Sequence, residues 1–527
     1  MRRIAPGLSG SQRRMVLGVA IILACASGAS ASYNFLVDPM ALDLGATREQ
    51  MVLLRQLPNV GTLLVVFLAG VWGSRLGMKR VTYASAVVMT LGYLIVLLAP
   101  SVPVATVGLL LGSVGKQGIS VVTISLIAAR ISGEANRATG FAAIGVAGPV
   151  AFLVIPVLSS LLLDASNWRV VVASWVLMGA AAVFISVTLL PSDGPRSATG
   201  EMWTPALAGL VLAGLVQTIR TMSSFGFTSP RTLGWLGATV IALVILWQLM
   251  ARWPKATLDL SILKRGGALL LLFIVILVPF GNLFYYFAIG AQRLYGYSAA
   301  EAALLMVPCQ IAAIAGAWFA GLLLRRLGMR MAGTLLMAGV SVTMFLTVAQ
   351  QADTPVAYPM LVLSLFALAY TGAGVVLTNA VMNLAPPGSE GSTSSARGAA
   401  WQLGIALGVA LSAAVFFGTA QSTMQDLVAE SGGDPGTAAV VVSALRDSTV
   451  TDSEIATQYA LPVDVVAEYD REWLQAQLTG YHAQGLLGGS VALVATVLFF
   501  FNRRAFRPQQ DQESSVPDPD QLGRREA

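Results

Sequence analysis

The sequence has little charge, one histidine and two cysteines. Only 11% of its 527 residues are charged, whereas about a quarter of a soluble domain is charged. Cys25 and Cys309 both lie in apolar runs, and no Cys or His spacing typical of a metal site occurs, so we expect neither a disulfide nor a bound metal. The sequence places no cluster of acids or thiols near His482 that could serve as its catalytic partner. We therefore expect no enzyme and no cofactor.

Long apolar runs make up most of the chain. Hydrophobic residues account for 56% of it. A membrane-spanning helix needs roughly 20 apolar residues, and we count about 14 such runs. The ten-residue alternation of a β-barrel is missing. The predicted fold class is an all-α polytopic membrane protein with runs at 15–37, 51–73, 81–99, 104–128, 139–163, 169–190, 204–222, 233–251, 267–289, 302–324, 331–350, 356–384, 398–419 and 484–501.

The cations predict the orientation, because Lys and Arg near helix ends are retained in the cytoplasm. An even number of crossings then places both termini on the cytoplasmic side of the cell membrane. We attribute the net charge of +6 to this topology and to anionic lipid, and we expect no nucleic acid as a partner. The cytoplasmic face collects Arg2, Arg3, Arg13, Arg14, Arg75, Lys79, Arg80, Arg130, Arg137, Arg252, Lys255, Lys264, Arg265, Arg325, Arg326, Arg330, Arg503, Arg504 and Arg507, and the opposite face collects Asp38, Asp43, Asp164 and Asp353.

A basic turn occurs twice. GVWGSRLGMKR, Gly70 to Arg80, ends the second run, and GLLLRRLGMR, Gly321 to Arg330, ends the tenth. Two copies at corresponding places predict two homologous halves, and parallel repeats of this kind place a central site between them. The predicted parts are a cytoplasmic N-terminus 1–14, a six-helix bundle 15–191, two inserted helices in 192–266, a second six-helix bundle 267–502 and a disordered tail 503–527. Segment 421–480 is predicted to be extracellular, with one or two short helices.

These features resemble the major facilitator superfamily, in particular its fourteen-helix drug:proton antiporter branch. Gly70, Arg75, Gly77 and Lys79 match the cytoplasmic-loop signature Gly-x-Leu-Ala-Asp-Arg-x-Gly-Arg-Lys. GPVAFLVIPVLSS, residues 148–160, is similar to the Gly-Pro antiporter signature of the fifth helix and keeps Gly148 and Pro149. NWRVVVASW, residues 167–175, and WQLGIALGVA, residues 401–410, are similar to stretches of the sixth and the penultimate helices. The resemblance implies a bacterial exporter that works as a monomer.

The chain departs from the family pattern at three charged positions. Ser74 stands where the loop signature has Asp, which in the family faces the positive end of a neighbouring helix. Ala29 occupies the place of an intramembrane Asp in the first helix. Val114 replaces the Arg of the fourth helix, with Lys116 two residues further on. Proton coupling is therefore expected to differ from that of the family.

The predicted membrane cores contain cations and no acid. Lys116 lies about 18 Å into the fourth run, at 1.5 Å per residue. A charge at that depth costs roughly 2.5–3.5 kcal/mol, so Lys116 is the leading candidate site residue. It binds an anionic group, titrates, or has a structural role beside Gln117. Arg55 snorkels to the outer surface or pairs with Asp38 as an outer gate.

Polar and aromatic side chains define the rest of the candidate site. Together they suit an amphipathic ligand, although Asn and Gln also join helices across a bundle. The substrate and coupling candidates are Lys116, Gln117, Asn34, Gln56, Asn59, Asn282, Tyr285, Tyr286, Gln310, Asn379, Asn383 and Gln402. The gating candidates are Asp38, Arg55, Gly70, Ser74, Arg75, Gly77, Lys79, Gly148, Pro149, Arg325, Arg326 and Gly328.

Three functions compete at this stage. The first is a proton-driven exporter of amphipathic small molecules that works by alternating access. The second is a carrier for an anionic metabolite or lipid-like molecule, suggested by an interior with cations and no core carboxylate. The third is a non-transporting membrane sensor or enzyme, for which the cytoplasmic loops offer no cluster of His, Cys or acids.

Overall fold

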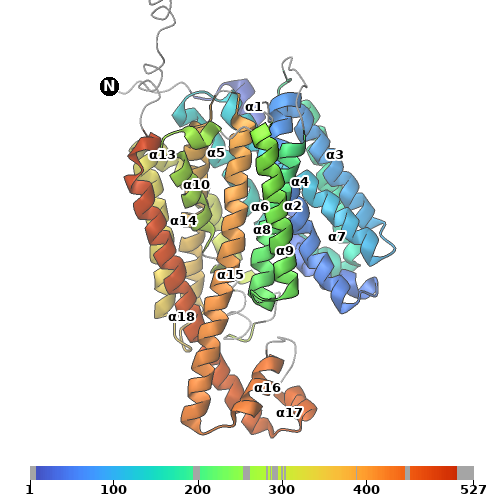
Figure 1. Ribbon diagram of the computed structural model, residues 1–527, viewed down its shortest axis with the longest axis vertical. Coiled ribbons are helices and arrows are strands. Elements are labelled where there is room, and N and C mark those ends of the chain that lie inside the picture. The colour runs from blue at the N-terminus through green and yellow to red at the C-terminus, as the bar shows by residue number, and fades with distance from the viewer. Residues whose placement is uncertain are drawn as a thin grey trace, which may run out of the picture.

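The computed structural model describes residues 7–193, 202–252, 261–280, 283–284, 287, 295–297, 301, 304–386, 388–445 and 452–506. The chain forms long helices that run roughly along one direction (Figure 1), and the described residues contain no strand. Among them, 12 helices are long and apolar enough to cross a membrane. This confirms the predicted all-α polytopic fold.

The first seven helices form one side of the molecule, which we call the N half. Its helices pack mainly as α3 on α4 and α7, α2 on α4, and α1 on α6 and α7. Capping boxes at Ser9 and Thr47 fix the starts of α1 and α2. A break at Val146, just before Gly148, divides the predicted fifth run in two. The helices are α1 Gly10–Asp43, α2 Arg48–Leu76, α3 Met78–Leu97, α4 Val102–Arg130, α5 Glu134–Gly145, α6 Ala147–Ala165 and α7 Trp168–Thr188.

The helices from α10 onward form the C half. In it α13 packs on α14 and α18, and α15 packs on α18 and α10. Its transmembrane helices are α10 Ala268–Leu277, which continues as η2 Val278–Phe280, α13 Val307–Leu346, which continues as η3 Thr347–Ala349, α14 Ala357–Asn383, α15 Glu390–Ser431 and α18 Val463–Phe501. Short 3-10 turns, η1 Ser261–Lys264 and η4 Arg503–Phe506, flank this half.

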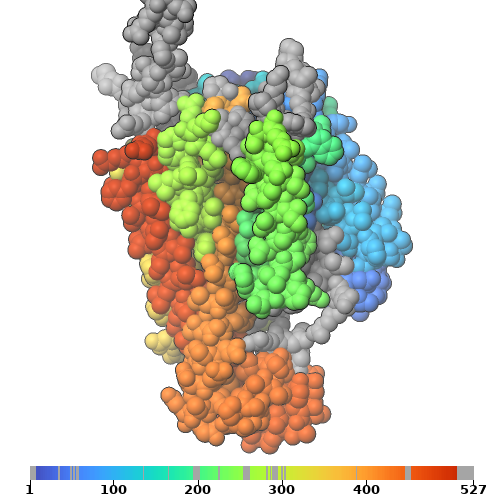
Figure 2. All heavy atoms as spheres, in the orientation of Figure 1, coloured from blue at the N-terminus to red at the C-terminus, as the bar shows by residue number. Residues whose placement is uncertain are grey.

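Two further helices, α8 Trp203–Phe225 and α9 Pro230–Arg252, lie over the boundary between the halves, where Figures 1 and 2 show them in green. Helix α8 packs on α2 and α15, and Gly209 lets its backbone approach Leu64 of α2. Helix α9 packs on α8 and exposes a row of apolar side chains that includes Ile241 and Trp247. Such a face suits lipid.

Both basic turns are helical hairpins that bend at a glycine. Gly77 separates α2 from α3 with φ +109°, and Gly328 bends α13 with φ +76°. Residues other than glycine rarely adopt these backbone conformations. Gly372 of α14 contacts both Gly316 and Leu336, so the two arms of α13 lie side by side as two crossings. We call the end of the bundle that carries both turns the basic end.

The opposite end carries a small helical cap, so we call it the cap end. Helices α15 and α18 extend beyond the bundle there, and the short helices α16 Pro435–Leu445 and α17 Asp452–Tyr459 pack against them (Figure 1). Val441, Ile455, Val466 and Trp473 are fully buried in a separate apolar core. The helical spacing of segment 421–480 predicted one or two short helices. Of the two stretches with that spacing, the first forms α16, whereas the second is the start of the long helix α18, and α17 was not predicted.

Candidate functional site

A cavity of about 280 Å³ lies between the two halves. This volume is just below the range of about 300–1,000 Å³ that small-molecule sites usually occupy. None of its lining residues in the described chain is acidic. The N half contributes Leu23, Ser27, Ser120, Ile124, Phe141, Ile144, Gly145, Ala147, Gly148 and Pro149, and the C half contributes Tyr370, Thr371, Gly374, Val375, Thr378, Arg397 and Trp401.

The wall from the C half is aromatic. The Tyr370 ring lies 5.7 Å from the Trp401 ring and 5.3 Å from the Phe366 ring, measured between centroids. Phe366 is fully buried behind Tyr370 and so holds the stack in place. Across the cavity, Phe141 and Ile144 present an apolar wall, and the hydroxyl groups of Ser27 and Ser120 supply hydrogen-bonding groups. Aromatic faces opposite hydroxyl groups suit an amphipathic molecule.

Arg397 is the charged residue of this cavity. Its guanidinium carbon lies 5.2 Å from the centre of the Trp401 ring, within the range of a cation–π contact. The Nε atom is buried without a hydrogen-bond partner. Within the described part of the chain, the guanidinium forms no hydrogen bond and no ion pair. A buried charge that has no hydrogen-bonding or ionic partner among the described residues is costly.

Sequence reasoning missed Arg397 because the run it belongs to was predicted to start at residue 398. Helix α15 instead begins at Glu390, so Arg397 lies about two turns inside it. The preceding stretch, GSTSSARG, is polar and reads as a loop. The available signal was the spacing of Arg397 and Trp401, which places the two side chains one turn apart on one helix face.

Lys116, the leading candidate from the sequence, lies about one turn beyond the cavity toward the cap end. Its Nζ donates a 2.7 Å hydrogen bond to Ser30 Oγ. Ser27, one turn before Ser30, and Ser120, one turn after Lys116, both line the cavity. Gln117 is buried, with its Nε2 atom near Gly398 on α15. The structure thus places Lys116 and Arg397 at similar depths on neighbouring helices of opposite halves.

The other predicted substrate residues are scattered. Asn379 is fully buried next to cavity residue Thr378, and its side-chain atoms have no hydrogen-bond partner among described residues. Asn383 accepts a hydrogen bond from Arg137 at the basic end. Gln310 and Gln402 are half-buried, and Asn59 is exposed. The side chains of Asn34 and Gln56, and all of Asn282, Tyr285 and Tyr286, lie outside the described residues.

On the basic side of the cavity, α15 lies directly against α2 and α4. Gly70 and Gly391 touch backbone to backbone, and a Cβ at either would overlap the carbonyl oxygen of the other. Ser74 lies at the same crossing, next to Gly391. Two serine hydroxyls donate to backbone carbonyls across the interface, Ser394 to Val121 and Ser395 to Val66, at 2.8 Å each.

A second contact between the halves joins α5 to α13 and α14 at the basic end. Arg137 Nη1 donates to Asn383 Oδ1 at 2.7 Å. Arg325 Nη1 donates to Thr139 Oγ1 at 3.2 Å. Gly145 packs against Val375, with no room for a Cβ between them. Together, the two contacts close the cavity toward the basic end.

The cations of the turns bind carbonyl groups at the ends of neighbouring helices. Lys79 Nζ donates to Val187 O and Leu190 O at the end of α7, and Arg330 Nε donates to Phe500 O at the end of α18. These are corresponding places in the two halves, and a cation is favourable at a helix C-terminus. Arg75 is half-buried, Arg326 is exposed, and Gly148 and Pro149 line the cavity.

A carboxylate still occupies the N-terminus of α3, although Ser74 replaces the acid of the loop signature. Asp193, from the segment after α7, accepts hydrogen bonds from the backbone nitrogens of Lys79 and Arg80 at 3.1 and 3.0 Å. It packs against Gly77, where a Cβ would overlap its carboxylate. This acid therefore stabilises the turn within the N half.

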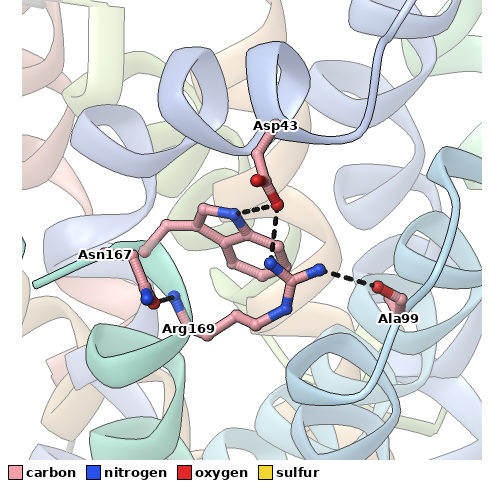
Figure 3. A network of polar contacts seen from close by, with 5 residues as sticks. Asp43, Ala99, Asn167 and Arg169 are labelled. Atoms are coloured by element: carbon pink, nitrogen blue, oxygen red, sulfur yellow. Dashed lines mark hydrogen bonds and ion pairs between the residues drawn. The ribbon is translucent and has the colours of Figure 1, made fainter.

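A polar network fastens the cap end of the N half (Figure 3). Asp43 Oδ2 accepts from Trp168 Nε1 at 3.0 Å and from Arg169 Nη1 at 2.6 Å, and Arg169 Nη2 donates to Ala99 O. The hydrogen bond from Trp168, with a further contribution from Arg169, lowers the pKa of the Asp43 carboxyl. Asp38, the predicted outer-gate acid, is exposed, and the side chain of its suggested partner Arg55 is outside the described residues.

Comparisons with known proteins agree with this architecture. The chain is 24% identical to the "Major facilitator superfamily multidrug transporter mfsC" of Aspergillus fumigatus over 54% of this chain and 55% of that protein. It is 22% identical to the "Multidrug resistance protein Stp" of Mycobacterium tuberculosis over 74% of this chain and 73% of that protein. The chain thus spans between about half and three quarters of the length of these relatives.

The fold matches solved transporters as well. The structure of the proton:xylose symporter XylE superimposes with a TM-score of 0.60 at 13% identity, covering 92% of this chain and 94% of that chain. At such low identity the likeness concerns the fold alone. The sequence model of the Major Facilitator Superfamily matches residues 19–409. The chain therefore belongs to the Major Facilitator Superfamily and is a multi-pass membrane transporter, as the motifs predicted, and not an enzyme.

Proposed function

We propose that this transporter exports amphipathic small molecules from the cytoplasm by alternating access, using the proton-motive force. The observation that carries the proposal is a cavity lined from both halves and closed toward the basic end by contacts that join the halves. If the halves separate at these contacts, the same cavity opens to the other side. The chemistry of the wall, aromatic with hydroxyl groups, suits amphipathic ligands.

The cations support the proposed orientation, and the relatives support the proposed direction of transport. The basic end faces the cytoplasm in this proposal, because Lys and Arg near helix ends are retained there. Both termini are then cytoplasmic in the cell membrane, and the cap is extracellular. The names of two relatives, a multidrug transporter and a multidrug resistance protein, support export of drug-like molecules. We expect the protein to act as a monomer.

The test compares cells that lack the gene, express it, or express one of two glycine variants of α15. Gly391→Ala adds a methyl group that overlaps the Gly70 carbonyl, whereas Gly418→Ala is a matched control, since a Cβ at Gly418 has nothing within 4 Å. Across a panel of amphipathic compounds, we expect the wild type and Gly418→Ala to lower accumulation. Gly391→Ala and an added protonophore should abolish that effect.

The result that contradicts the proposal is equal accumulation of every compound with and without the gene, at matched amounts of protein in the membrane. If expression raises the accumulation of a compound in the cells, the protein imports it and the proposed direction of transport is wrong. Export that continues at full rate with the protonophore would remove the proton-motive force as its energy source.

A further inference from the structure

We propose that the cavity recognises amphipathic anions, with Arg397 as the residue that binds the anionic group. The inference rests on the proposed transport function and names its substrate class. It covers carboxylates, sulfonates and related oxyanions attached to an aromatic or apolar body.

The first observation is that Arg397 has no counter-ion among the described residues. Its Nε is buried and unpartnered, and the guanidinium has no hydrogen bond or ion pair among the described residues. No acidic residue is found in the described lining of the cavity. Charges in membrane interiors are otherwise paired with one another or with backbone carbonyls. A ligand that carries its own negative charge supplies the missing partner.

The second observation is the shape of the donor group. The guanidinium is planar and presents its N–H donors in a fork that matches the two oxygens of a carboxylate or similar group. The contact with Trp401, 5.2 Å from the guanidinium carbon, holds the side chain from one side. Trp401 is in turn supported by Tyr370, with 5.7 Å between ring centroids. The fork is thus held in position for an incoming oxyanion.

The third observation is a second cation at a similar depth. Lys116 on α4 donates to Ser30, one turn from the cavity serines Ser27 and Ser120. The register between α4 and α15 follows from the Ser394 to Val121 hydrogen bond and from the approach of Gln117 to Gly398. Two cations from opposite halves raise the positive potential of the cavity, which disfavours cationic ligands and favours anions.

The rest of the cavity limits what the anion is attached to. Tyr370 and Trp401 offer ring faces beside Arg397, and Phe141 with Ile144 forms an apolar wall opposite. The volume of about 280 Å³ accommodates a fused-ring aromatic acid and is too small for a two-chain phospholipid. We therefore infer a small aromatic or apolar anion.

The test uses purified full-length protein in non-ionic detergent, where no gradient exists, and three naphthalene probes. Naphthalene-2-sulfonate is an anion, naphthalene-2-sulfonamide is a neutral compound of nearly the same shape, and (2-naphthylmethyl)trimethylammonium is a cation. Calorimetry measures the affinity of each. We expect the wild type to bind the sulfonate at least about 30-fold more tightly than the sulfonamide, the lower range for a buried charge pair.

Variants locate the effect. Arg397→Gln should bring the affinities for sulfonate and sulfonamide to within about 3-fold of each other. Arg397→Lys keeps the charge and loses the fork, so it should retain part of the preference. The matched control is Arg503→Gln, the same substitution at an exposed arginine of the basic end, and it should keep the full preference. Thermal unfolding checks that each variant is folded.

The outcomes separate this inference from the proposed function. Equal affinity of the wild type for sulfonate and sulfonamide, or tighter binding of the cation, overturns the anion site whatever the variants do. A preference that survives in folded Arg397→Gln overturns the role of Arg397. If the sulfonate binds as expected but cells show no gene-dependent export of any compound, the site stands and the export proposal fails.

Discussion

The two basic turns occupy equivalent places in the two halves, yet the helices that lead into them contact the opposite half with different closeness. Gly70 and Gly321 each stand five residues before the arginine of their turn. Gly70 touches the backbone of Gly391 on α15, whereas a Cβ at Gly321 would meet only the methyl group of Ala142, at 3.0 Å. An added Cβ at Gly70 would overlap a backbone carbonyl deeply, whereas at Gly321 it would come only a few tenths of an ångström too close to Ala142. The turn of the N half is therefore the tighter part of the closure.

The same substitution at the two equivalent glycines gives the largest expected difference. In Gly70→Ala the new methyl overlaps the Gly391 carbonyl in the closed form alone, at a cost of about 1–3 kcal/mol. This shifts the balance toward the open basic end by about 5- to 150-fold. Gly321→Ala needs a displacement of a few tenths of an ångström and should have little effect. Export rates at equal expression measure both, and equal rates in the two variants would refute the asymmetry.

Substitutions of the two glycines at the bends should differ in their effect on protein stability, and not in their effect on opening of the basic end. Gly77→Ala and Gly328→Ala both place a side chain at positive φ, which costs about 1–3 kcal/mol. At Gly77 the new methyl also displaces Asp193 from the start of α3, for about 1 kcal/mol more. Nothing lies within 4 Å of a Cβ at Gly328. Thermal unfolding in detergent should rank Gly77→Ala as the less stable protein, and the opposite ranking would show that Asp193 does not support the turn.

Loss of single hydroxyl groups should sharpen the comparison further. Ser394→Ala removes a buried hydrogen bond to Val121 O in the tighter contact, worth about 1 kcal/mol. Thr139→Val removes the acceptor of Arg325 in the second, more exposed contact, between α5 and α13. We expect this loss to destabilise the closed form by less than about 0.5 kcal/mol. The population of the closed form should fall more in Ser394→Ala. A larger fall in Thr139→Val would reverse the assignment of the tighter contact.

The smallest effect is expected at the cap end, where Asp43 fastens α1 to α7 away from the closure. Because the pKa of Asp43 is lower in the folded protein, its contribution is complete above the unfolded value of about 4 and disappears as the pH falls through the folded value. The difference in unfolding temperature between wild type and Asp43→Asn should be constant near neutral pH and shrink below about pH 4. A difference that grows with acidity would contradict this sign.

Much of the architecture was predictable from the sequence, because lipid imposes strong constraints on it. Apolar runs of about 20 residues, the repeated turn and the cations near helix ends each follow from the bilayer. The bends at Gly77 and Gly328 could be located because each glycine sits between an arginine and a cation. The motifs of the family were enough to identify it.

The contents of the site were less predictable, because polar residues buried between helices look like loop residues in a sequence. GSTSSARG is an example. Its serines are buried, and the hydroxyls of Ser394 and Ser395 donate to backbone carbonyls of α4 and α2. That choice depends on the register between helices far apart in the chain. The contacts of Asn383 and Asp193 were equally unpredictable. Asn383 accepts a hydrogen bond from Arg137, and Asp193, which follows α7, accepts one from the backbone nitrogen of Lys79 at the start of α3.

The most direct test of alternating access is a distance measurement across the closure at the basic end. Spin labels at Ala129→Cys on α4 and Leu327→Cys on α13, both exposed positions, report on opposite halves in a background with Cys25 and Cys309 replaced by Ser. We predict a short-distance population in the wild type and a longer one that becomes dominant in Gly70→Ala but not in Gly321→Ala. A single short distance in all three proteins would contradict the account.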